Sequence, residues 1–478
     1  MPDDLMFKPA TEQAALVRSG EASARELVQA SLAAIDRVNN DLNAVVTRCD
    51  ERALAEADAV QAGDERPLAG VPLLVKDLGA LTEGVRTTMG MRAMEDWVPD
   101  RDSATVRRLR AGGAIVVGKT NLPEMGILPV SEPLRFGPAR NPWDTSRTPG
   151  GSSGGSAAGV AAGMVAIAHG NDGGGSIRIP ASCCGLVGLK PSRGRVSWAP
   201  HLSELASGYA TDGVLTRTVR DSALGLDLIA GYEPGDPYWA PDPSAPFVEA
   251  VEREPGKLRI AFVVDSPNGV PVDPDCVAAT RRAAELLESL GHEVNEVTIE
   301  ADEGYVANFV TVWIAGTANE VETWSRLAGR ELDIEQLEPL SRQMYDMSLE
   351  MSATDYLRSL DWLYDYSRQI VAMWEGIDVL LTPTLATPPI EIGALEPKEG
   401  EPPIQMLMNS AGFVPFTPVW NVTGQPAISL PPHQTEAGLP VGVQLVGPPA
   451  GEELLLSLSA QIEESAPWAD RRPELAIA

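Results

Sequence analysis

Histidine and cysteine are scarce in this chain, with four residues of each among 478. Cys49, Cys183, Cys184 and Cys276 show no C-x-x-C spacing or similar zinc-binding pattern. So few cysteines in a chain of this length also argue against a disulfide framework. The adjacent pair Cys183-Cys184 is better explained as small buried apolar side chains than as a redox site. The sequence therefore predicts neither a metal site nor disulfide stabilisation.

Long apolar runs and basic residues are also lacking. No apolar run approaches the roughly 18 residues of a membrane span, and residues 1–10 lack the pattern of a signal peptide. The chain has 37 Lys and Arg against 67 Asp and Glu, a net charge of −30. Such acidity argues against a nucleic acid or an anionic membrane as partner. We expect a cytoplasmic protein, a monomer or homodimer, that acts on a small molecule.

Apolar residues make up 44% of the chain, which is ample for a sizeable core. Their spacing predicts helices over residues 11–39, from about 103 to 112, and over 275–290. Short apolar runs predict strands at 70–75, 114–117, 258–264, 378–381 and 441–446. Strands that alternate with helices indicate a layered α/β architecture.

Between residues 150 and 176 the composition shifts to glycine, alanine and serine. Low complexity is usually typical of a linker. Here the small residues lie among Val160, Met164, Val165 and Ile167, which favours a tightly packed helix and strand between two loops.

One motif in the chain resembles a nucleotide-binding loop. Residues 113–120, GAIVVGKT, match the Walker A pattern. In a phosphate-binding loop the strand ends before the first glycine, and free N–H groups cradle the phosphate. Here Ala-Ile-Val-Val is itself typical of a buried strand, and Asn121-Leu122-Pro123 is a poor start for the helix that must follow. We interpret the segment as a strand and the turn after it.

A second motif, Gly151 to Gly155, fits G-x-S-x-G with Ser153 as nucleophile. An α/β-hydrolase elbow needs a strand before the serine, and an acid and a histidine later in the chain. The preceding residues 146–150 have the composition of a loop. His201, His292 and His433 could each be the base, but none has distinctive surroundings.

The third candidate combines Lys76, at the end of an apolar run, with Ser152 and Ser176, which lie 24 residues apart in glycine-rich segments. Ser176 follows Asp172 and three glycines, whose N–H groups have no Cβ beside them and could hold an oxyanion. A serine needs a base in contact, and a lysine serves as one when burial keeps it neutral. The alternative is a flexible glycine turn without function.

Residues 150–192 closely resemble the amidase signature family, in GGSSGGSAAGVAAG and GNDGGGSIRIPASCCGLVGLKPS. Residues 70–77, 118–121, 424–427 and 438–442 resemble it too, in the family's order. The resemblance implies one α/β/α domain over residues 1–478, with a mixed β-sheet core flanked by helices. Its expected parts are an N-terminal helical part (1–65), a signature core (66–225) and a C-terminal part with pocket elements (226–478).

The resemblance also implies a Ser–cis-Ser–Lys site without metal or organic cofactor. Ser176 takes the nucleophile position, Ser152 the cis-serine position that relays the proton, and Lys76 the position of the base. The implied oxyanion hole consists of backbone N–H groups of Gly173, Gly174, Gly175 and Ser176. Residues that match positions supporting this loop are Ser153, Asp172 and Arg178.

Within the family, residues 141–143, 169–172 and 178–182 are most similar to hydrolases of nylon-oligomer cyclic dimers. Related aryl acylamidases and urethanases cleave aryl amides, small amides and carbamates. The implied function is therefore hydrolysis of xenobiotic amides and carbamates through an acyl-enzyme. Trp313 stands where a cyclic-dimer hydrolase has a cysteine, and a bulkier wall would change the ligand. The residues expected to form the pocket wall are Met125, Gly126, Ile127, Trp313, Val419, Trp420 and Asn421.

Two other functions are compatible with the same motifs. The glutaminase subunit of a tRNA-dependent amidotransferase shares them, but it would need partner subunits and would prefer glutamine. The second alternative is a non-catalytic binding protein on the same scaffold. Because Lys76, Ser152 and Ser176 are all present, the motifs favour an enzyme.

Overall fold

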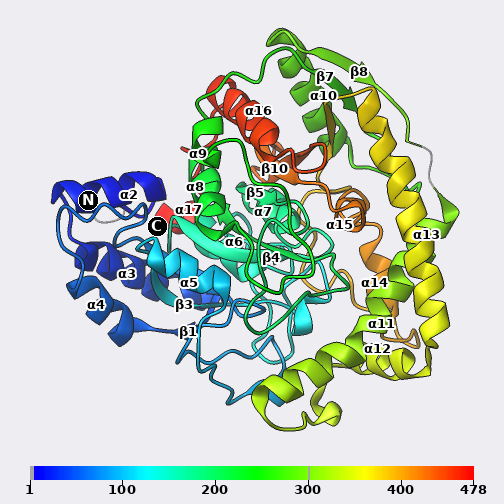
Figure 1. The fold of residues 1–478 in the computed structure, drawn as a ribbon, viewed down its shortest axis with the longest axis horizontal. Coiled ribbons are helices and arrows are strands. Elements are labelled where there is room, and N and C mark those ends of the chain that lie inside the picture. The colour runs from blue at the N-terminus through cyan, green and yellow to red at the C-terminus, as the bar shows by residue number, and fades with distance from the viewer. Residues whose placement is uncertain (1–4, 300–301, 478) are drawn as a thin grey trace.

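A mixed β-sheet extends through the molecule (Figure 1). The computed structural model describes residues 5–299 and 302–477, and within them eleven strands form this sheet in the order β1-β3-β2-β4-β6-β5-β10-β11-β9-β7-β8. The strands are β1 (Val45–Arg48), β2 (Pro72–Lys76), β3 (Ile115–Thr120), β4 (Ile167–Asp172), β5 (Val187–Lys190), β6 (Thr211–Thr216), β7 (Arg259–Phe262), β8 (Glu293–Glu296), β9 (Val379–Pro383), β10 (Ala427–Gln434) and β11 (Pro440–Val446).

Helices cover both faces of this sheet, and further helices pack together beside it. They are α2 (Ala10–Ser19), α3 (Ala24–Leu42), α4 (Asp50–Asp58), α5 (Ala104–Ala111), α6 (Gly154–Ala161), α7 (Arg178–Cys184), α8 (Val219–Ile229), α9 (Phe247–Ala250), α10 (Pro274–Ser289), α11 (Glu303–Ala328), α12 (Pro339–Glu350), α13 (Ala353–Val371), α14 (Gln405–Ser410), α15 (Val419–Thr423), α16 (Glu452–Ser465) and α17 (Glu474–Ile477). Short 3-10 turns lie at Arg92–Met94, Glu124–Gly126, Ile334–Gln336 and Ala372–Glu375.

The alternation of side chains along the strands divides the interior into two cores. On β2, Leu73 and Val75 join the core beneath α5, α8, α10 and α16, whereas Leu74 joins the core beneath α3, α4, α6 and α7. Successive side chains of a strand point to opposite faces, so a strand covered on both sides is apolar throughout. The expected single α/β domain with helices on both faces of a mixed sheet is therefore confirmed.

Parallel pairing brings two strand ends together near the centre of the sheet. β2 pairs in parallel with both β3 and β4, and β7 pairs in parallel with β8 and β9, whereas the other neighbours are antiparallel. Lys76 is the last residue of β2 and Asp172 the last residue of β4. Because parallel strands end at the same edge, these two residues meet there.

The expected helix over residues 11–39 is wrong as one continuous element. Two helices, α2 and α3, occupy this region. Gly20 has a φ of 78°, a left-handed conformation that ends α2. Ser23 then begins α3 with a capping box: its side chain accepts from the Glu26 N–H, and the Glu26 carboxylate accepts from the Ser23 N–H at 2.7 Å.

The Walker A-like segment forms a strand, as expected. β3 includes Lys119, whose side chain is fully buried and donates from Nζ to the Ala80 carbonyl at 2.8 Å. Asp77 Oδ1 lies 4.0 Å from the same Nζ. This lysine is enclosed by protein and does not face a phosphate-binding loop.

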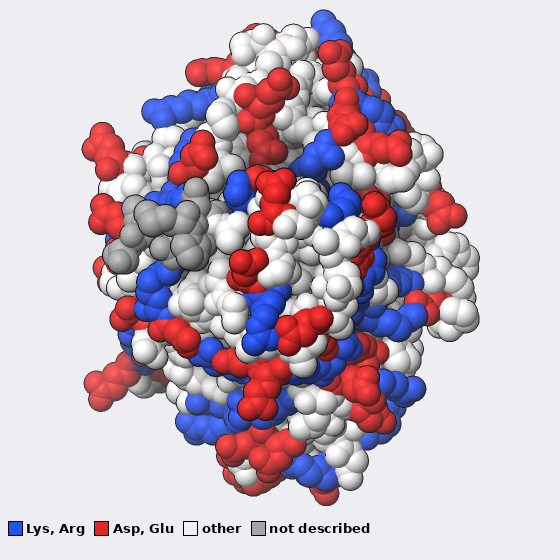
Figure 2. All heavy atoms as spheres, turned by 90° about the vertical axis from the view of Figure 1, so that its left-hand side faces the viewer, with Lys and Arg blue, Asp and Glu red and all other residues white. Residues whose placement is uncertain are grey.

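The helices α11, α12 and α13 pack against one another along one side of the molecule, at the right of Figure 1. None of the helices in the described part of the chain is long and apolar enough to cross a membrane. On the face drawn in Figure 2, acidic and basic side chains are interspersed.

Replacing Ser23 with alanine removes the side-chain acceptor at the start of α3. We expect the free energy of unfolding to fall by about 1 kcal/mol. Urea unfolding followed by circular dichroism measures this change. Ser19→Ala is the matched control, because Ser19 is an exposed residue at the end of α2. An equal loss of unfolding free energy in both variants would mean that the Ser23 cap does not stabilise the protein more than an ordinary exposed serine.

Candidate active site

Lys76 lies at the centre of the site. Its side chain is fully buried, and its Nζ lies 2.6 Å from Ser152 Oγ and 2.6 Å from Asn171 Oδ1. Asn171 in turn donates from Nδ2 to the Leu78 carbonyl at 2.9 Å, which fixes the orientation of its amide. The ammonium or amine of Lys76 is thus held between a serine and an oriented amide oxygen.

Burial lowers the pKa of Lys76 to about 7, because the charged ammonium loses its hydration. The negative charges of Asp172 and Asp212 oppose this effect and keep the pKa from falling further. A lysine with such a pKa is neutral in a large fraction of molecules near pH 7. It can therefore accept a proton at an ordinary physiological pH.

Ser152 lies in the loop that leads into α6. The Gly151–Ser152 peptide bond is cis, in agreement with the conformation that the resemblance implies. A Cβ on Gly151 would lie 2.5 Å from the Val130 nitrogen, so only glycine fits before Ser152. A Cβ on Gly126 would lie 3.1 Å from Ser152 Oγ. The backbone at Val130 therefore packs against Gly151, and the backbone at Gly126 packs against Ser152 itself.

The loop that carries Ser176 is held by a buried ion pair. Arg178 donates from Nε to Asp172 Oδ2 at 2.9 Å and from Nη2 to Oδ1 at 2.8 Å, and both side chains are fully buried. Burial by itself would raise the pKa of Asp172, but the charge and hydrogen bonds of Arg178 hold it well below its usual range. Asp172 therefore stays ionised and keeps accepting hydrogen bonds from the loop.

The remaining Arg178 hydrogens reach distant parts of the chain. Nη1 donates to the Thr417 carbonyl at 2.9 Å and to Gln444 Oε1 at 2.7 Å, and Nη2 donates to Asn421 Oδ1 at 2.7 Å. A guanidinium can satisfy several acceptors in one plane, which a lysine cannot do. The loop that carries Ser176 is thereby tied to the C-terminal third.

The expected oxyanion hole needs one correction. The Gly175 N–H donates to Asp172 Oδ1 at 2.7 Å and is not available to a substrate. Within the described residues, the N–H groups of Gly173, Gly174 and Ser176 make no hydrogen bond. Gly175 is required for another reason: its φ is 129°, and a Cβ there would lie 2.6 Å from Ile179 Cδ1.

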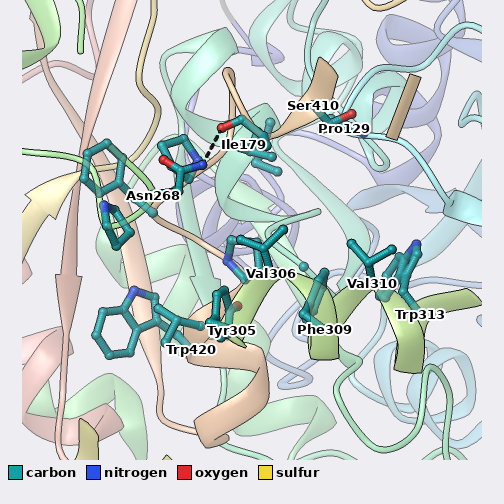
Figure 3. A pocket seen from close by; sticks show the side chains of 18 of the residues that line it. Pro129, Ile179, Asn268, Tyr305, Val306, Phe309, Val310, Trp313, Ser410 and Trp420 are labelled. Carbon is teal, nitrogen blue, oxygen red and sulfur yellow. Dashed lines mark hydrogen bonds between the residues drawn. The ribbon is translucent and has the colours of Figure 1, made fainter. Parts of the chain in front are cut away.

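Ser176 opens onto an apolar cavity of about 440 Å³. One wall comes from α11, where Tyr305, Phe309 and Trp313 follow one another at one-turn spacing (Figure 3). The ring centroids of Tyr305 and Phe309 are 6.0 Å apart, and those of Phe309 and Trp313 are 5.6 Å apart. A cavity of this size and lining is typical of a small-molecule site.

Most of the expected wall residues line this space. Gly126, Ile127, Trp313, Val419 and Trp420 line the 440 Å³ cavity, and Met125 lines a smaller passage beside it.

Asn421 does not line the cavity, and its assignment to the wall is wrong. Its Nδ2 donates to the carbonyl and to Oδ1 of Asp172, both at 2.9 Å. Being polar, this residue is drawn to the buried charges behind the loop rather than to an apolar wall.

The structure also decides against the G-x-S-x-G interpretation. Ser153 Oγ donates to the Asn171 carbonyl at 3.2 Å, and the Ser153 N–H donates to the Ser176 carbonyl at 3.3 Å. None of the three candidate histidines is hydrogen-bonded to Ser153. The contacts are of His201 with the Arg101 carbonyl, of His292 with the Leu258 N–H and Gln461, and of His433 with Arg282. Ser153 thus joins the two loops to each other.

Several residues of the site were missed by sequence analysis. Asn171 stands inside the glycine-rich motif, and its position one residue before Asp172 was an available signal. Gln444 is a polar residue in an otherwise apolar strand, which also marks it. Tyr305, Phe309 and Thr417 lie in segments without any such pattern.

The fold and the site belong to a hydrolase of carbon–nitrogen bonds in amides. The chain is a member of the amidase signature family: the family model described as Amidase matches residues 26–456. It is 40% identical to 6-aminohexanoate-cyclic-dimer hydrolase of Pseudomonas sp. (strain NK87), over 98% of this chain and 97% of that protein.

Solved structures agree with this assignment. A structure of 6-aminohexanoate cyclic dimer hydrolase superimposes with a TM-score of 0.94 at 40% identity, and covers 98% of this chain and 99% of that one. A bacterial aryl acylamidase of the amidase signature family superimposes with a TM-score of 0.85 at 27% identity, over 97% of each chain.

Replacing Arg178 with methionine would leave the Asp172 carboxylate buried without its cation. We expect the free energy of unfolding to fall by about 3–5 kcal/mol, as measured by denaturant unfolding. The matched control is Arg25→Met, which removes an exposed ion pair with Asp58 and should cost less than about 1 kcal/mol. Similar losses in the two variants would contradict the structural role of the buried pair.

Proposed function

We propose that this amidase cleaves amides and carbamates through an acyl-enzyme on Ser176, with Ser152 as proton relay and Lys76 as general base. The observation that carries the proposal is the 2.6 Å hydrogen bond between Lys76 Nζ and Ser152 Oγ. Ser152 and Ser176 both line the same small passage, so a proton has a short route from one hydroxyl to the other. The pKa of Lys76, about 7, suits this route at neutral pH.

In the proposed reaction, Ser176 Oγ attacks the carbonyl carbon while its proton passes to Ser152 and the Ser152 proton passes to Lys76. The oxyanion is stabilised by the free N–H groups of Gly173, Gly174 and Ser176. Ser152 then donates a proton to the nitrogen, the C–N bond breaks and the amine leaves. Water hydrolyses the acyl-enzyme by the same proton route, which restores Ser176 and releases the acid.

The apolar cavity supports an uncharged acyl group, aromatic or aliphatic. Its aromatic wall on α11 offers flat surfaces for an aryl ring. A carbamate reacts by the same steps as an amide: its C–N bond breaks, the amine leaves, and a carbonate ester remains on Ser176 until water hydrolyses it. We therefore include urethanes among the proposed substrates.

Glutamine fits this cavity poorly. Among its described lining residues there is no Lys, Arg or His to pair with the glutamine α-carboxylate, whereas Asp265 and Asp302 are present. Transfer of a carboxylate into such a site without a partner is costly. This argues against the amidotransferase alternative and makes glutamine a suitable control substrate.

Release of 4-nitroaniline from a matched aryl amide and aryl carbamate tests the proposal. We expect the parent protein to hydrolyse both, and Ser176→Ala and Lys76→Met to lose roughly 10³-fold or more in kcat/KM. Circular dichroism and a serine-directed covalent probe separate loss of chemistry from loss of folding. Turnover of glutamine alone would favour the amidotransferase, and failure of the probe to label Ser176 would favour a binding protein.

The pH dependence of kcat/KM tests the role of Lys76. The base must be neutral, so kcat/KM should rise with pH up to about 7 and level off above it. Asp212→Asn removes a negative charge that raises the pKa of Lys76, and it should move the rising limb to lower pH. The same substitution also removes the charged partner of His169, because His169 Nε2 lies 3.2 Å from Asp212 Oδ1.

The control for this measurement is Asp41→Asn, which removes a charge from the exposed surface of α3. Asp41→Asn should leave the pH dependence of kcat/KM the same as in the parent protein. A rising limb that stays in place in Asp212→Asn would show that a group other than Lys76 is titrating. The substrate pair is free of titratable groups in this range.

A further inference from the structure

One face of α11 borders three adjoining spaces. Tyr305, Phe309 and Trp313 line the 440 Å³ cavity, Trp313 and Gly316 line the small passage, and Gly316 and Glu320 line a second cavity of about 420 Å³. Residues three or four apart share one face of a helix, so a single helix borders all three spaces. Figure 3 shows the first part of this row, with Trp313 at its end.

The passage lies between the two larger cavities, beside Ser176. It shares four lining residues with the 440 Å³ cavity, namely Gly126, Ile127, Ser176 and Trp313. It shares four others with the 420 Å³ cavity, namely Leu205, Ala206, Gly316 and Glu320. The nucleophile is thus reached from both sides, and Glu320 marks the junction on the far side.

Glu320 places a carboxyl group at the border between the passage and the second cavity. Among the described residues, no hydrogen bond or ion pair is found for its side chain. Neither the passage nor the second cavity is lined by a described Lys, Arg or His. Burial raises the pKa of Glu320 to about 7, and no neighbouring cation lowers it. The Glu320 side chain is only partly buried and lines both spaces, so its carboxyl group is open to a cation that enters them.

The 440 Å³ cavity and the passage lie on two sides of Ser176, and they differ in whether they can bind the acyl half or the amine half of a substrate. Ser152 lines the passage but not the 440 Å³ cavity. If Ser152 protonates the departing nitrogen, as in the proposed function, the amine half must lie on the Ser152 side. The acyl half then occupies the apolar cavity, and the amine half extends along the passage toward Glu320.

We propose that Glu320 is a specificity-determining residue that binds an ammonium group on the amine half of the substrate. This inference rests on the proposed function, because it takes the acyl half and the amine half from that mechanism. The favoured substrates are amides of an apolar acid with a diamine, in which the second nitrogen is a free ammonium. A hydrogen bond between a carboxylate and an ammonium is among the stronger ones in proteins, and an acidic chain attracts the cation.

N-substituted benzamides with ω-aminoalkyl groups from ethyl to hexyl, each paired with its ω-hydroxyalkyl twin, test the proposal. The measured quantity is kcat/KM from benzoate release. For each linker length, the kcat/KM of the amino compound is divided by the kcat/KM of its hydroxyl twin. In the parent protein this ratio should peak at one linker length, at about 10 to 100. Glu320→Gln keeps the shape but removes the charge, and should bring the ratio close to one at every length.

The control variant is Glu322→Gln, an exposed residue of the same helix that lines none of the three spaces, and it should keep the parental ratio. Glu320→Asp, which retracts the carboxylate by one methylene, should move the peak to a longer linker. A parental ratio at or below one, or a ratio unchanged in Glu320→Gln, would overturn the assignment. Failure of the proposed function is distinct: the hydroxyl twins would not be hydrolysed, or Ser176→Ala would still hydrolyse them.

Discussion

Asp172 and Arg178 form their ion pair, 2.8 Å long, where neither side chain reaches solvent. The pair lies between the end of β4 and the start of α7, so it sets the shape of the loop that carries Ser176. Asp172 also accepts from the Gly175 N–H, and Arg178 binds acceptors from the C-terminal third. Each partner alone would be a costly buried charge, which makes the loop conformation and the long-range contacts depend on each other.

The second constraint is the environment of Lys76. Burial favours the neutral amine, and the nearby carboxylates favour the ammonium, so the two effects together bring its pKa to about 7. A lysine in water would be almost fully protonated at that pH. The sheet supplies this environment, because β2 is covered by helices on both faces and ends inside the protein. Lys76 and the loop that carries Ser176 are thus both held in place by the protein itself.

The family's catalytic motifs could be found in the sequence because they are contiguous. Lys76, Ser152, Ser176 and their glycine-rich neighbours occur in short segments whose residue types are tied to local backbone geometry. The strands at β2, β3, β7, β9 and β11 were predicted for a similar reason, since buried strands are short apolar runs. The break between α2 and α3 was missed because Gly20 can either continue a helix weakly or end it, and the helical pattern resumes at once.

The sequence by itself determined the family, the α/β class and the three residues proposed for catalysis. Only the tertiary structure decided which N–H groups of the loop are free, that Asn421 lies behind the loop and that Asn171 contacts Lys76. It alone also placed the aromatic side chains of α11 and Glu320 along the spaces beside Ser176. The physical reason is that a cavity wall is built from side chains distant in sequence, so no local pattern records which of them face the same space.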